Sequence, residues 1–439
     1  MEILIKTGQF LLSISILVVL HEFGHFAFAK LFKTRVEKFY LFFNPWFSLF
    51  KFKKGETEYG MGWIPLGGYV KISGMIDESM DKEQMKQPAQ PYEFRAKKSW
   101  QRLLIMLGGV MVNFVTALVI YSAVLYTWGD QYLPNNNVEY GIVVDSLAHD
   151  MGLRNGDKII SIDNNKVDDF HQIMLDIVLD DSKTVQIKRS GENMEIPVPE
   201  TLRKQLLHSN GFIDVRIPFY IGGFVKDFPA EKSGLKLKDR LIAINGNPTE
   251  YYDEFSNSIA NCKNKLTSFS VLRDKDTLNF DIQVSEEGMI GVYAEHYANF
   301  LNLEKINYSL MASVPAGIDK GIETFKSYLK QLKLIFSPKT EAYKSLGGFI
   351  TIGKIFPGTW NWQAFWNLTA FLSIILAIMN VLPIPALDGG HVMFLLYEMI
   401  TGRKPSDKFL EYAQIAGMVL LLALLIFANG NDIFKLFNK

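Results

Sequence analysis

The sequence predicts a polytopic α-helical membrane protein with four transmembrane helices, a membrane-associated β-sheet and two extracytoplasmic α+β domains of one kind. Three features lead to this fold class. Four stretches approach the roughly 20 mostly apolar residues that a hydrocarbon core of about 30 Å requires. The loop between the first two stretches is rich in aromatic residues, which suit an interface with lipid headgroups. The long segment between the second and third stretches contains an internal repeat.

The composition agrees with a membrane protein of several parts. A chain of 439 residues suggests about three structural units, at roughly 150 residues per domain. Charged residues make up 21% of the chain, below the roughly 25% of a soluble domain, and mean hydropathy is +0.08. Basic and acidic residues number 46 each, so no basic surplus favours nucleic acid as a partner. Cys262 is the only cysteine, so any metal site needs histidine and carboxylate ligands.

Eight segments follow in order along the chain. They are 1–30, transmembrane helix 1; 31–101, a cytoplasmic-side loop with membrane-associated β-strands; 102–129, transmembrane helix 2; 137–215 and 216–292, the two repeats; 300–360, an amphipathic helix and linker; 362–392, transmembrane helix 3; and 411–431, transmembrane helix 4. A signal peptide is the alternative for the first segment, with Lys6 before the apolar core and Ala29 near a cleavage site. Ionisable residues between that core and that site favour a retained helix.

Positive charges beside the spans predict the orientation, because lysine and arginine are enriched in short cytoplasmic loops. They flank the first loop and the loop between spans three and four: Lys30, Lys33, Arg35, Lys38, Arg95, Lys97, Lys98, Arg102, Arg403, Lys404 and Lys408. Both loops are therefore expected in the cytoplasm. Both termini and the repeats are expected outside it.

The repeat aligns GIVVDSLAHDMGLRNGDKIISIDNN, from Gly141, with GFVKDFPAEKSGLKLKDRLIAINGN, from Gly223. Its pattern resembles PDZ domains, which bind an extended peptide as an added strand at a sheet edge. Peptide capture or substrate filtering is the functional interpretation, and a pair of spacer domains is the alternative. The second copy has Lys238 where the first has Gly156, which weakens the expected turn there.

His21-Glu22-Phe23-Gly24-His25 forms an H-E-x-x-H motif at the end of the first span. Residues four apart lie on one face of a helix, so both imidazoles can bind one ion. Zinc suits two neutral imidazoles and a carboxylate, and it leaves a fourth position for water. Glu22 would accept a proton from that water and pass it to the leaving amide nitrogen. Ionisable groups in a membrane span are energetically costly, so they are usually functional. The membrane setting therefore supports a functional role more strongly than the short motif does alone.

A third protein ligand is needed, and two residues near the cytoplasmic end of the third span are candidates. Asp388 and His391 both lie in Asn380-Val-Leu-Pro-Ile-Pro-Ala-Leu-Asp-Gly-Gly-His. The two glycines permit a sharp turn and a close backbone approach, which would let a ligand project toward span one. Spacing alone leaves the two candidates tied.

Together these motifs resemble the site-2 proteases of the regulator-of-sigma-E type. The resemblance rests on HEFGH in the first span, LDGGH after the third, the tandem PDZ-like repeats and IPLGGYVKI in the first loop, and it covers nearly the whole chain. It implies one zinc ion per chain, bound by His21, His25 and Asp388, with Glu22 as the catalytic base. A G-x-x-x-N pattern ending at Asn113 also matches the second span of the family, although a glycine stands where proline is common.

The resemblance also implies a re-entrant sheet in the first loop that pairs with an unwound substrate segment. An amide inside a helix is shielded and must be extended before water attacks it, and a sheet edge offers replacement hydrogen bonds. We expect this edge at Gly60, Met61, Gly62 and Trp63. The amide of Asn380 is expected to bind the extended backbone from the opposite side.

An amphipathic helix is predicted within 300–360. Its apolar positions recur at helical spacing, and they are Phe325, Tyr328, Leu329, Leu332, Ile335 and Phe336. The helix would either pack beneath the repeats or lie on the bilayer, and the lysines off its apolar face slightly favour lipid.

The predicted function is that of an intramembrane zinc endopeptidase in a bacterial inner membrane, with its active site towards the cytoplasmic side. Its expected partners are the lipid bilayer and single-span membrane proteins, such as anti-sigma-factor-like substrates, or signal-peptide remnants. Cleavage would follow a first cut that removes the extracytoplasmic bulk, as in regulated intramembrane proteolysis. A catalytically inactive PDZ-bearing membrane scaffold and a metal transporter are the alternatives. Glu22 argues against both, since binding or transport of metal needs no base.

Overall fold

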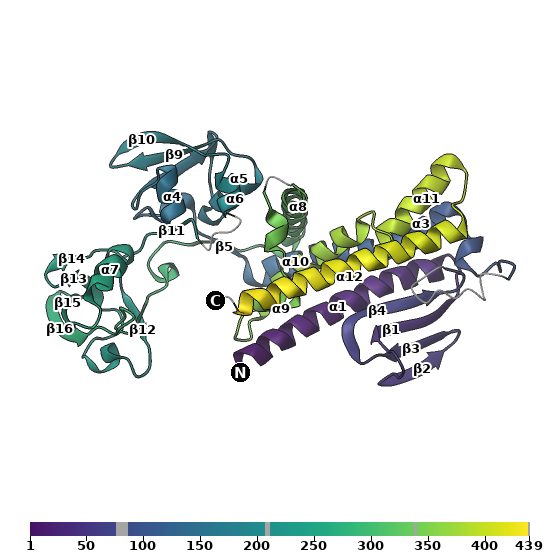
Figure 1. Cartoon of the computed structure of the whole chain (residues 1–439), viewed down its shortest axis with the longest axis horizontal. Helices are drawn as coiled ribbons and strands as arrows, with labels where there is room; N and C mark the ends of the chain where they lie inside the picture. The colour runs from purple at the N-terminus through teal and green to yellow at the C-terminus, as the bar shows by residue number, and fades with distance from the viewer. Residues whose placement is uncertain (76–86, 207–210, 338–339, 438–439) are drawn as a thin grey trace. The chain divides into compact units, whose positions relative to one another are not determined.

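The computed structural model of the chain describes residues 1–75, 87–206, 211–337 and 340–437. It contains two compact units (Figure 1). The first unit comprises Met1–Gly129, Asn307–Lys333 and Tyr343–Lys439, and the second comprises Asp130–Ile306 and Leu334–Ala342. The first unit carries the long apolar helices, and the second carries the repeats.

Four helices of the first unit are long and apolar enough to cross a membrane. They are α1 (Glu2–Leu31), α3 (Ser99–Trp128), α10 (Trp362–Val381) and α12 (Asp407–Phe437). Each of the four spans predicted from the sequence thus overlaps one of these candidate membrane-spanning helices. Both α1 and α10 pack against α3 (Figure 1).

The third predicted span, 362–392, consists of two helices. α10 ends at Val381, and a separate helix, α11, covers Asp388–Thr401. Pro383 and Pro385 explain the break, because proline lacks a backbone N–H and disfavours helical conformation in the residue before it. Asp388 is therefore the first residue of a new helix.

A four-stranded sheet follows α1 in the chain. Its strands are β1 (Val36–Phe43), β2 (Phe50–Lys54), β3 (Thr57–Met61) and β4 (Ile64–Ile72). They lie in the order β2-β3-β1-β4, with β3 parallel to β1 and the other pairs antiparallel. β4 is an edge strand and contacts α1, so this edge lies beside the helix that carries the H-E-x-x-H motif.

The free edge expected at residues 60–63 is not found there. Gly60 and Met61 belong to β3, which pairs with β1 on one side and β2 on the other. The backbone N–H groups of Gly62 and Trp63 donate to carbonyl groups of β1. The prediction was wrong about the strand, because the edge beside α1 belongs to the next strand, β4.

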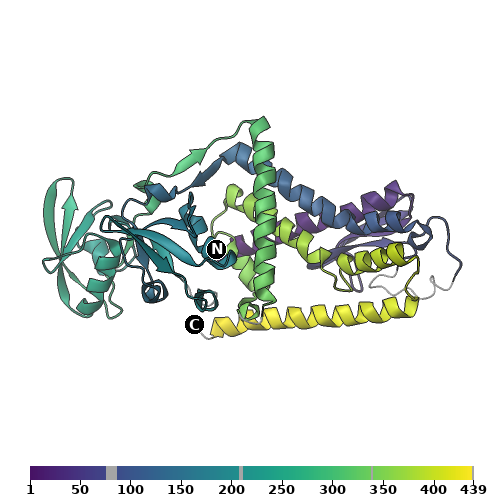
Figure 2. The same ribbon diagram turned by 90° about the horizontal axis from the view of Figure 1, so that it is seen from above.

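The amphipathic helix expected within 300–360 is α8 (Leu310–Ile335). It crosses α3 (Figure 2), and Gly317 and Gly321 permit the close approach. A Cβ on either glycine would lie 2.3 Å from a side-chain atom of α3. Phe325 contacts Phe114 of α3, with ring centroids 5.6 Å apart. The shorter helices of this unit are η1 (Phe94–Ala96) and α9 (Phe349–Ile355), and η7 spans Ala342–Ser345.

The second unit contains two copies of one α+β arrangement. Each has a four-stranded sheet, ordered β8-β7-β9-β10 or β14-β13-β15-β16, and a two-stranded ribbon, β6-β11 or β12-β17. The strands of the first copy are β6 (Ile142–Val144), β7 (Lys158–Ile162), β8 (Asn165–Lys166), β9 (Thr184–Arg189), β10 (Glu192–Pro197) and β11 (Ile213–Val215). Those of the second are β12 (Ile221–Phe224), β13 (Arg240–Ile244), β14 (Asn247–Pro248), β15 (Leu266–Arg273), β16 (Asp276–Gln283) and β17 (Val292–Ala294). The shared strand order supports the repeat found in the sequence.

Short helices and one further strand pair complete the second unit. The helices are α4 (Ser146–Met151), α5 (Ile173–Leu179), α6 (Leu202–Leu206), α7 (Tyr252–Ile259), η2 (Asn135–Asn137), η3 (Phe170–Gln172), η4 (Pro229–Lys232), η5 (Ala260–Cys262) and η6 (Tyr297–Asn299). β5 (Asp130–Tyr132) pairs antiparallel with β18 (Glu304–Ile306). The chain therefore enters and leaves the repeats on neighbouring strands.

A bidentate ion pair recurs at the same place in both copies. Arg189 donates to both carboxylate oxygens of Asp157 at 2.7 Å, and Arg273 donates to both oxygens of Asp239 at 2.7 Å. Both aspartates are almost completely buried. Such pairs hold the start of one strand to the end of another in each sheet.

The turn before each of these aspartates keeps its shape without a glycine in the second copy. Gly156 has a φ of +90° and Lys238 has a φ of +67°, so both residues adopt a left-handed backbone conformation. This conformation is uncommon for a residue with a side chain. The turn expected to be weakened at Lys238 is nevertheless formed.

Candidate metal centre

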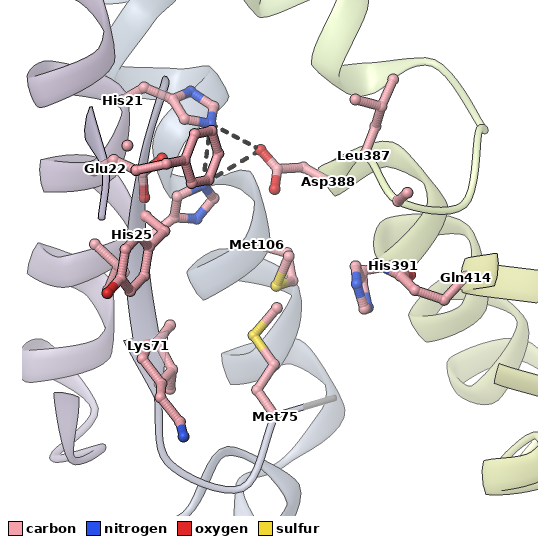
Figure 3. Close-up of a pocket in the computed structure, with 16 residues that line it drawn as sticks. His21, Glu22, His25, Lys71, Met75, Met106, Leu387, Asp388, His391 and Gln414 are labelled. Atoms are coloured by element: carbon pink, nitrogen blue, oxygen red, sulfur yellow. Dashed lines mark hydrogen bonds and ion pairs between the residues drawn. The ribbon is translucent and has the colours of Figure 1, made fainter. Parts of the chain in front are cut away.

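Three side chains that could bind a metal ion, from two helices of the first unit, converge on one point (Figure 3). His21 and His25 lie four residues apart on one face of α1, and Asp388 begins α11. The Nε2 atoms of the two histidines are 3.2 Å apart. Oδ2 of Asp388 lies 3.2 Å from Nε2 of His21 and 3.3 Å from Nε2 of His25. Within the described residues, this is the one cluster of three such side chains close enough to bind a common ion.

The triangle of ligand atoms has the dimensions of a zinc site. Tetrahedral zinc binds imidazole nitrogen and carboxylate oxygen at about 2.0–2.2 Å, which separates neighbouring ligand atoms by about 3.3–3.6 Å. Oδ2 of Asp388 is buried and, in the described part of the chain, accepts no hydrogen bond of good geometry. A buried carboxylate oxygen in that state is costly unless a cation binds it. Two imidazoles with a carboxylate are also the donor set of many catalytic zinc sites.

Glu22 lines the same cavity as the three ligands (Figure 3). It follows His21 in α1 and is not one of the converging ligands. β4 passes beside it at Gly68, where a Cβ would lie 3.4 Å from Cγ of Glu22. A carboxylate is thus available next to the metal ligands without being one of them.

Two glycines direct Asp388 toward α1. A Cβ on Gly389 would lie 2.2 Å from the carbonyl oxygens of Val381 and Leu382. A Cβ on Gly390 would lie 2.6 Å from Cα of Pro385. The first turn of α11 therefore packs directly on the backbone at the end of α10, which is the close approach predicted from the glycine pair.

The cavity around these groups has a volume of about 360 Å³. Residues 68–72 of β4 form one wall, and Met106 of α3 and Gln414 of α12 contribute others (Figure 3). His391 also lines the cavity but does not converge with the ligands. Between the two residues that spacing left tied, the structure brings Asp388 to the imidazoles.

The predicted substrate-binding residues lie elsewhere. Neither Asn380 nor residues 60–63 are among the described residues that line the cavity. The β4 residues that do line it were missed, although the glycine pair in IPLGGYVKI is a signal for a strand that another backbone approaches closely. Gln414, about two turns into a long apolar helix, carries no comparable signal in the sequence.

Comparison with known proteins places the chain in a family. A profile of peptidase family M50 matches residues 9–424. The chain is 28% identical to the regulator of sigma E protease of Haemophilus influenzae, over 99% of this chain and 100% of that protein. It is 27% identical to a protein of Rickettsia conorii, over 98% of each chain, and 29% identical to one of Campylobacter jejuni, over 98% and 93%. Both of these relatives are provisionally named zinc metalloproteases.

Proposed function

Because the chain belongs to peptidase family M50 and is a zinc metalloprotease, we propose that it cleaves membrane-spanning substrates within the bilayer. The observation that carries this proposal is the position of the ligands. His21 and His25 lie in α1, a helix long and apolar enough to cross a membrane. Ionisable groups on such a helix are usually functional, and here they would meet substrates whose backbone also lies in the membrane.

Glu22 is assigned the role of general base. When bound, zinc supplies Lewis acidity, which polarises a carbonyl group and lowers the pKa of water. Glu22 lies in the same cavity, where it accepts the proton of the attacking water and delivers it to the leaving amide nitrogen. One water is consumed and one peptide bond is broken, so no further reactant is needed.

The substrate backbone is proposed to bind along β4, an edge strand of the described sheet. Peptide groups inside a helix are already hydrogen-bonded, so the substrate must be extended before cleavage. Residues 68–72 of β4 line the cavity, and β1 is the strand that pairs with β4 in the described sheet. An added substrate strand would therefore regain its backbone hydrogen bonds beside the metal ligands. The clamp predicted at Asn380 stays a prediction.

The two copies in the second unit are proposed to be PDZ-like domains that filter substrates outside the cytoplasm. Their shared strand order and the sequence pattern support this assignment. Steric exclusion of bulky substrates and capture of a newly exposed terminus are the two mechanisms. Gly156 and Lys238 form equivalent turns, so the absence of glycine in the second copy no longer argues against a groove there.

We place the protein in a bacterial inner membrane, with the metal centre towards the cytoplasmic side. The lysines and arginines that flank the first loop support this orientation. The name of the Haemophilus relative, regulator of sigma E protease, favours single-span regulators such as anti-sigma-factor-like proteins as substrates. Signal-peptide remnants are a second substrate class, and both would make the enzyme part of regulated intramembrane proteolysis.

The Glu22→Gln variant tests the catalytic assignment against the inactive-scaffold alternative. In liposomes with a model single-span substrate, this variant is expected to keep its zinc and to lose cleavage by about 10²–10⁴-fold. Glu2→Gln, at the exposed start of the same helix, is the matched control and should cleave normally. Zinc-loaded native protein that cleaves no membrane-spanning substrate would favour the scaffold, and retained cleavage in Glu22→Gln would remove Glu22 as the base.

A further inference from the structure

One face of α3 runs past both imidazoles of the metal centre. Ile105, Gly109 and Asn113 are spaced four residues apart and form a stripe along the helix. A Cβ on Gly109 would lie 2.5 Å from Nε2 of His25 and 2.6 Å from Cε1 of His21. Glycine at this position thus brings the helix into contact with the rings. Ile105 and Asn113, one turn away on either side of Gly109, therefore come within hydrogen-bonding distance of the two imidazoles.

Each imidazole meets one residue of this stripe at Nδ1, the ring nitrogen that is not part of the converging cluster. The carbonyl oxygen of Ile105 lies 2.9 Å from Nδ1 of His25, and the amide Nδ2 of Asn113 lies 3.2 Å from Nδ1 of His21. Asn113 is completely buried, and its main-chain carbonyl accepts a 2.7 Å hydrogen bond from the hydroxyl of Ser373. Oδ1 of Asn113 is also buried and has no hydrogen-bond partner in the described part of the chain.

Metal binding decides which atom of this amide must face His21. A neutral imidazole that gives Nε2 to a metal carries its proton on Nδ1, which then needs an acceptor. Ile105 already offers an acceptor to His25. A half-turn of the Asn113 amide about its Cβ–Cγ bond exchanges Nδ2 and Oδ1 in place, and so offers an acceptor to His21. The same half-turn gives the unpartnered oxygen a donor.

We propose that Asn113 is a positioning residue of the zinc site. Its Oδ1 accepts a hydrogen bond from Nδ1–H of His21 and thereby fixes the tautomer and the orientation of that ring for metal binding. A hydrogen-bond acceptor at the other ring nitrogen raises the basicity of a histidine ligand. It also fixes the ring orientation before the metal binds, so less conformational entropy is lost on binding. The proposal requires the zinc site but not the proposed membrane substrate, so its test does not depend on cleavage.

The test measures zinc affinity by competition with a chelator, and the visible absorption of the cobalt-substituted protein, on the full chain in detergent. Asn113→Leu removes the acceptor at similar volume and is expected to bind zinc about 10–100-fold more weakly, with an altered cobalt spectrum. Asn113→Asp keeps an acceptor oxygen and is expected to restore native affinity and spectrum. Ser373→Ala is the matched control, because it loosens the packing of Asn113 without touching its amide.

A folded Asn113→Leu protein with native zinc affinity overturns the proposal. An equal loss in Ser373→Ala also overturns it, because the effect would then come from helix packing. If Asn113→Leu does not fold, Asn113→Ala takes its place. The proposal then requires weak binding in the alanine variant and native binding in the aspartate variant, and any other pattern contradicts it.

Discussion

Gly24 of α1 and Gly108 of α3 pack backbone against backbone. A Cβ on Gly24 would lie 2.2 Å from the carbonyl oxygen of Gly108, and a Cβ on Gly108 would lie 2.6 Å from the carbonyl oxygen of Gly24. Gly24 precedes the ligand His25, and Gly108 precedes the glycine that touches the imidazoles. This contact therefore sets the separation between the helix that carries two candidate metal ligands and the helix that packs against it.

The Gly24→Ala variant is expected to be destabilised by about 1–3 kcal/mol and to bind less zinc, because a methyl group has no room between the two backbones. Thermal unfolding and metal analysis measure the two effects. Gly8→Ala in the same helix is the control, since a Cβ there meets no atom within 4 Å and alanine favours a helix. Equal behaviour of the two variants would contradict the close contact.

Purified protein is expected to contain about one zinc ion per chain. The metal should be lost in His21→Ala, His25→Ala and Asp388→Ala, because each supplies one atom of the converging cluster. His391→Ala should largely keep it, since His391 lines the cavity without joining that cluster. Metal analysis decides between the two candidates. Full zinc in Asp388→Ala together with an empty site in His391→Ala would show that the third ligand is misassigned.

Proline in β4 is expected to reduce substrate cleavage without removing zinc. Successive residues of an antiparallel strand direct their N–H groups alternately to the partner strand and to the free edge. Val70 and Lys71 are consecutive, so one of their backbone N–H groups points toward β1 and the other points away from it. The proline variant that removes the N–H pointing away from β1 leaves the described sheet intact and should keep its zinc. Its cleavage should fall roughly tenfold, as expected for the loss of about 1.4 kcal/mol.

Lys53→Pro in β2, the opposite edge of the sheet, is the control for these proline variants and should cleave normally. If a zinc-loaded β4 variant also cleaves the model substrate at the native rate, strand addition at this edge does not occur. Proline at Met61 or Trp63 would not test strand addition. Both residues already pair with neighbouring strands, so the substitution would disrupt the sheet itself.

Removal of the repeats is expected to let bulky substrates be cut. β5 and β18 pair antiparallel, so residues 133–303 can be replaced by a short glycine-serine linker that joins the two strands as a hairpin. Under steric exclusion this protein should cleave intact substrates, and its Glu22→Gln version should not. Under terminus capture it should instead cleave shortened substrates more slowly. A stable, zinc-loaded protein with unchanged activity on both substrates would make the repeats spacers.

The Asp239–Arg273 pair is expected to make the stability of the second unit depend on pH. Burial alone would raise the pKa of the Asp239 carboxyl, but hydrogen bonds from Arg273 and from the backbone N–H of Lys236 outweigh it and hold that pKa below its usual range. A carboxyl with a lowered pKa stabilises the folded state above its unfolded pKa of about 3.9, and this contribution is lost as the pH falls toward the folded value. Asp239→Asn should therefore unfold more easily than native protein at pH 7.

The measurement for this pair is chemical unfolding of the full chain at several pH values, followed by a signal of the second unit. The difference between native protein and Asp239→Asn should shrink as the pH falls below about 4. A difference that stays constant over this range would mean that the variant acts through packing and not through the charge.

The candidate metal ligands that cluster in the structure could be predicted from the sequence, whereas the pairing order of the sheet could not. His21 and His25 follow from helical periodicity, which is a local property. Asp388 and His391 lie within one turn of the same helix, so spacing could not show which one faces α1, and the family resemblance decided. Residues 57–61 and 64–72 have similar strand patterns, and the insertion of β3 between β1 and β2 depends on tertiary pairing that neither pattern encodes.

A zinc ion at this centre would act as a cross-link between two distant parts of the chain. His25 belongs to the first helix, whereas Asp388 follows the entire second unit in sequence. The complete site exists only when these distant parts are folded together, so the free energy of metal binding becomes free energy of folding. A chelator is therefore expected to loosen the attachment of α11 to α1 while each helix keeps its own backbone hydrogen bonds.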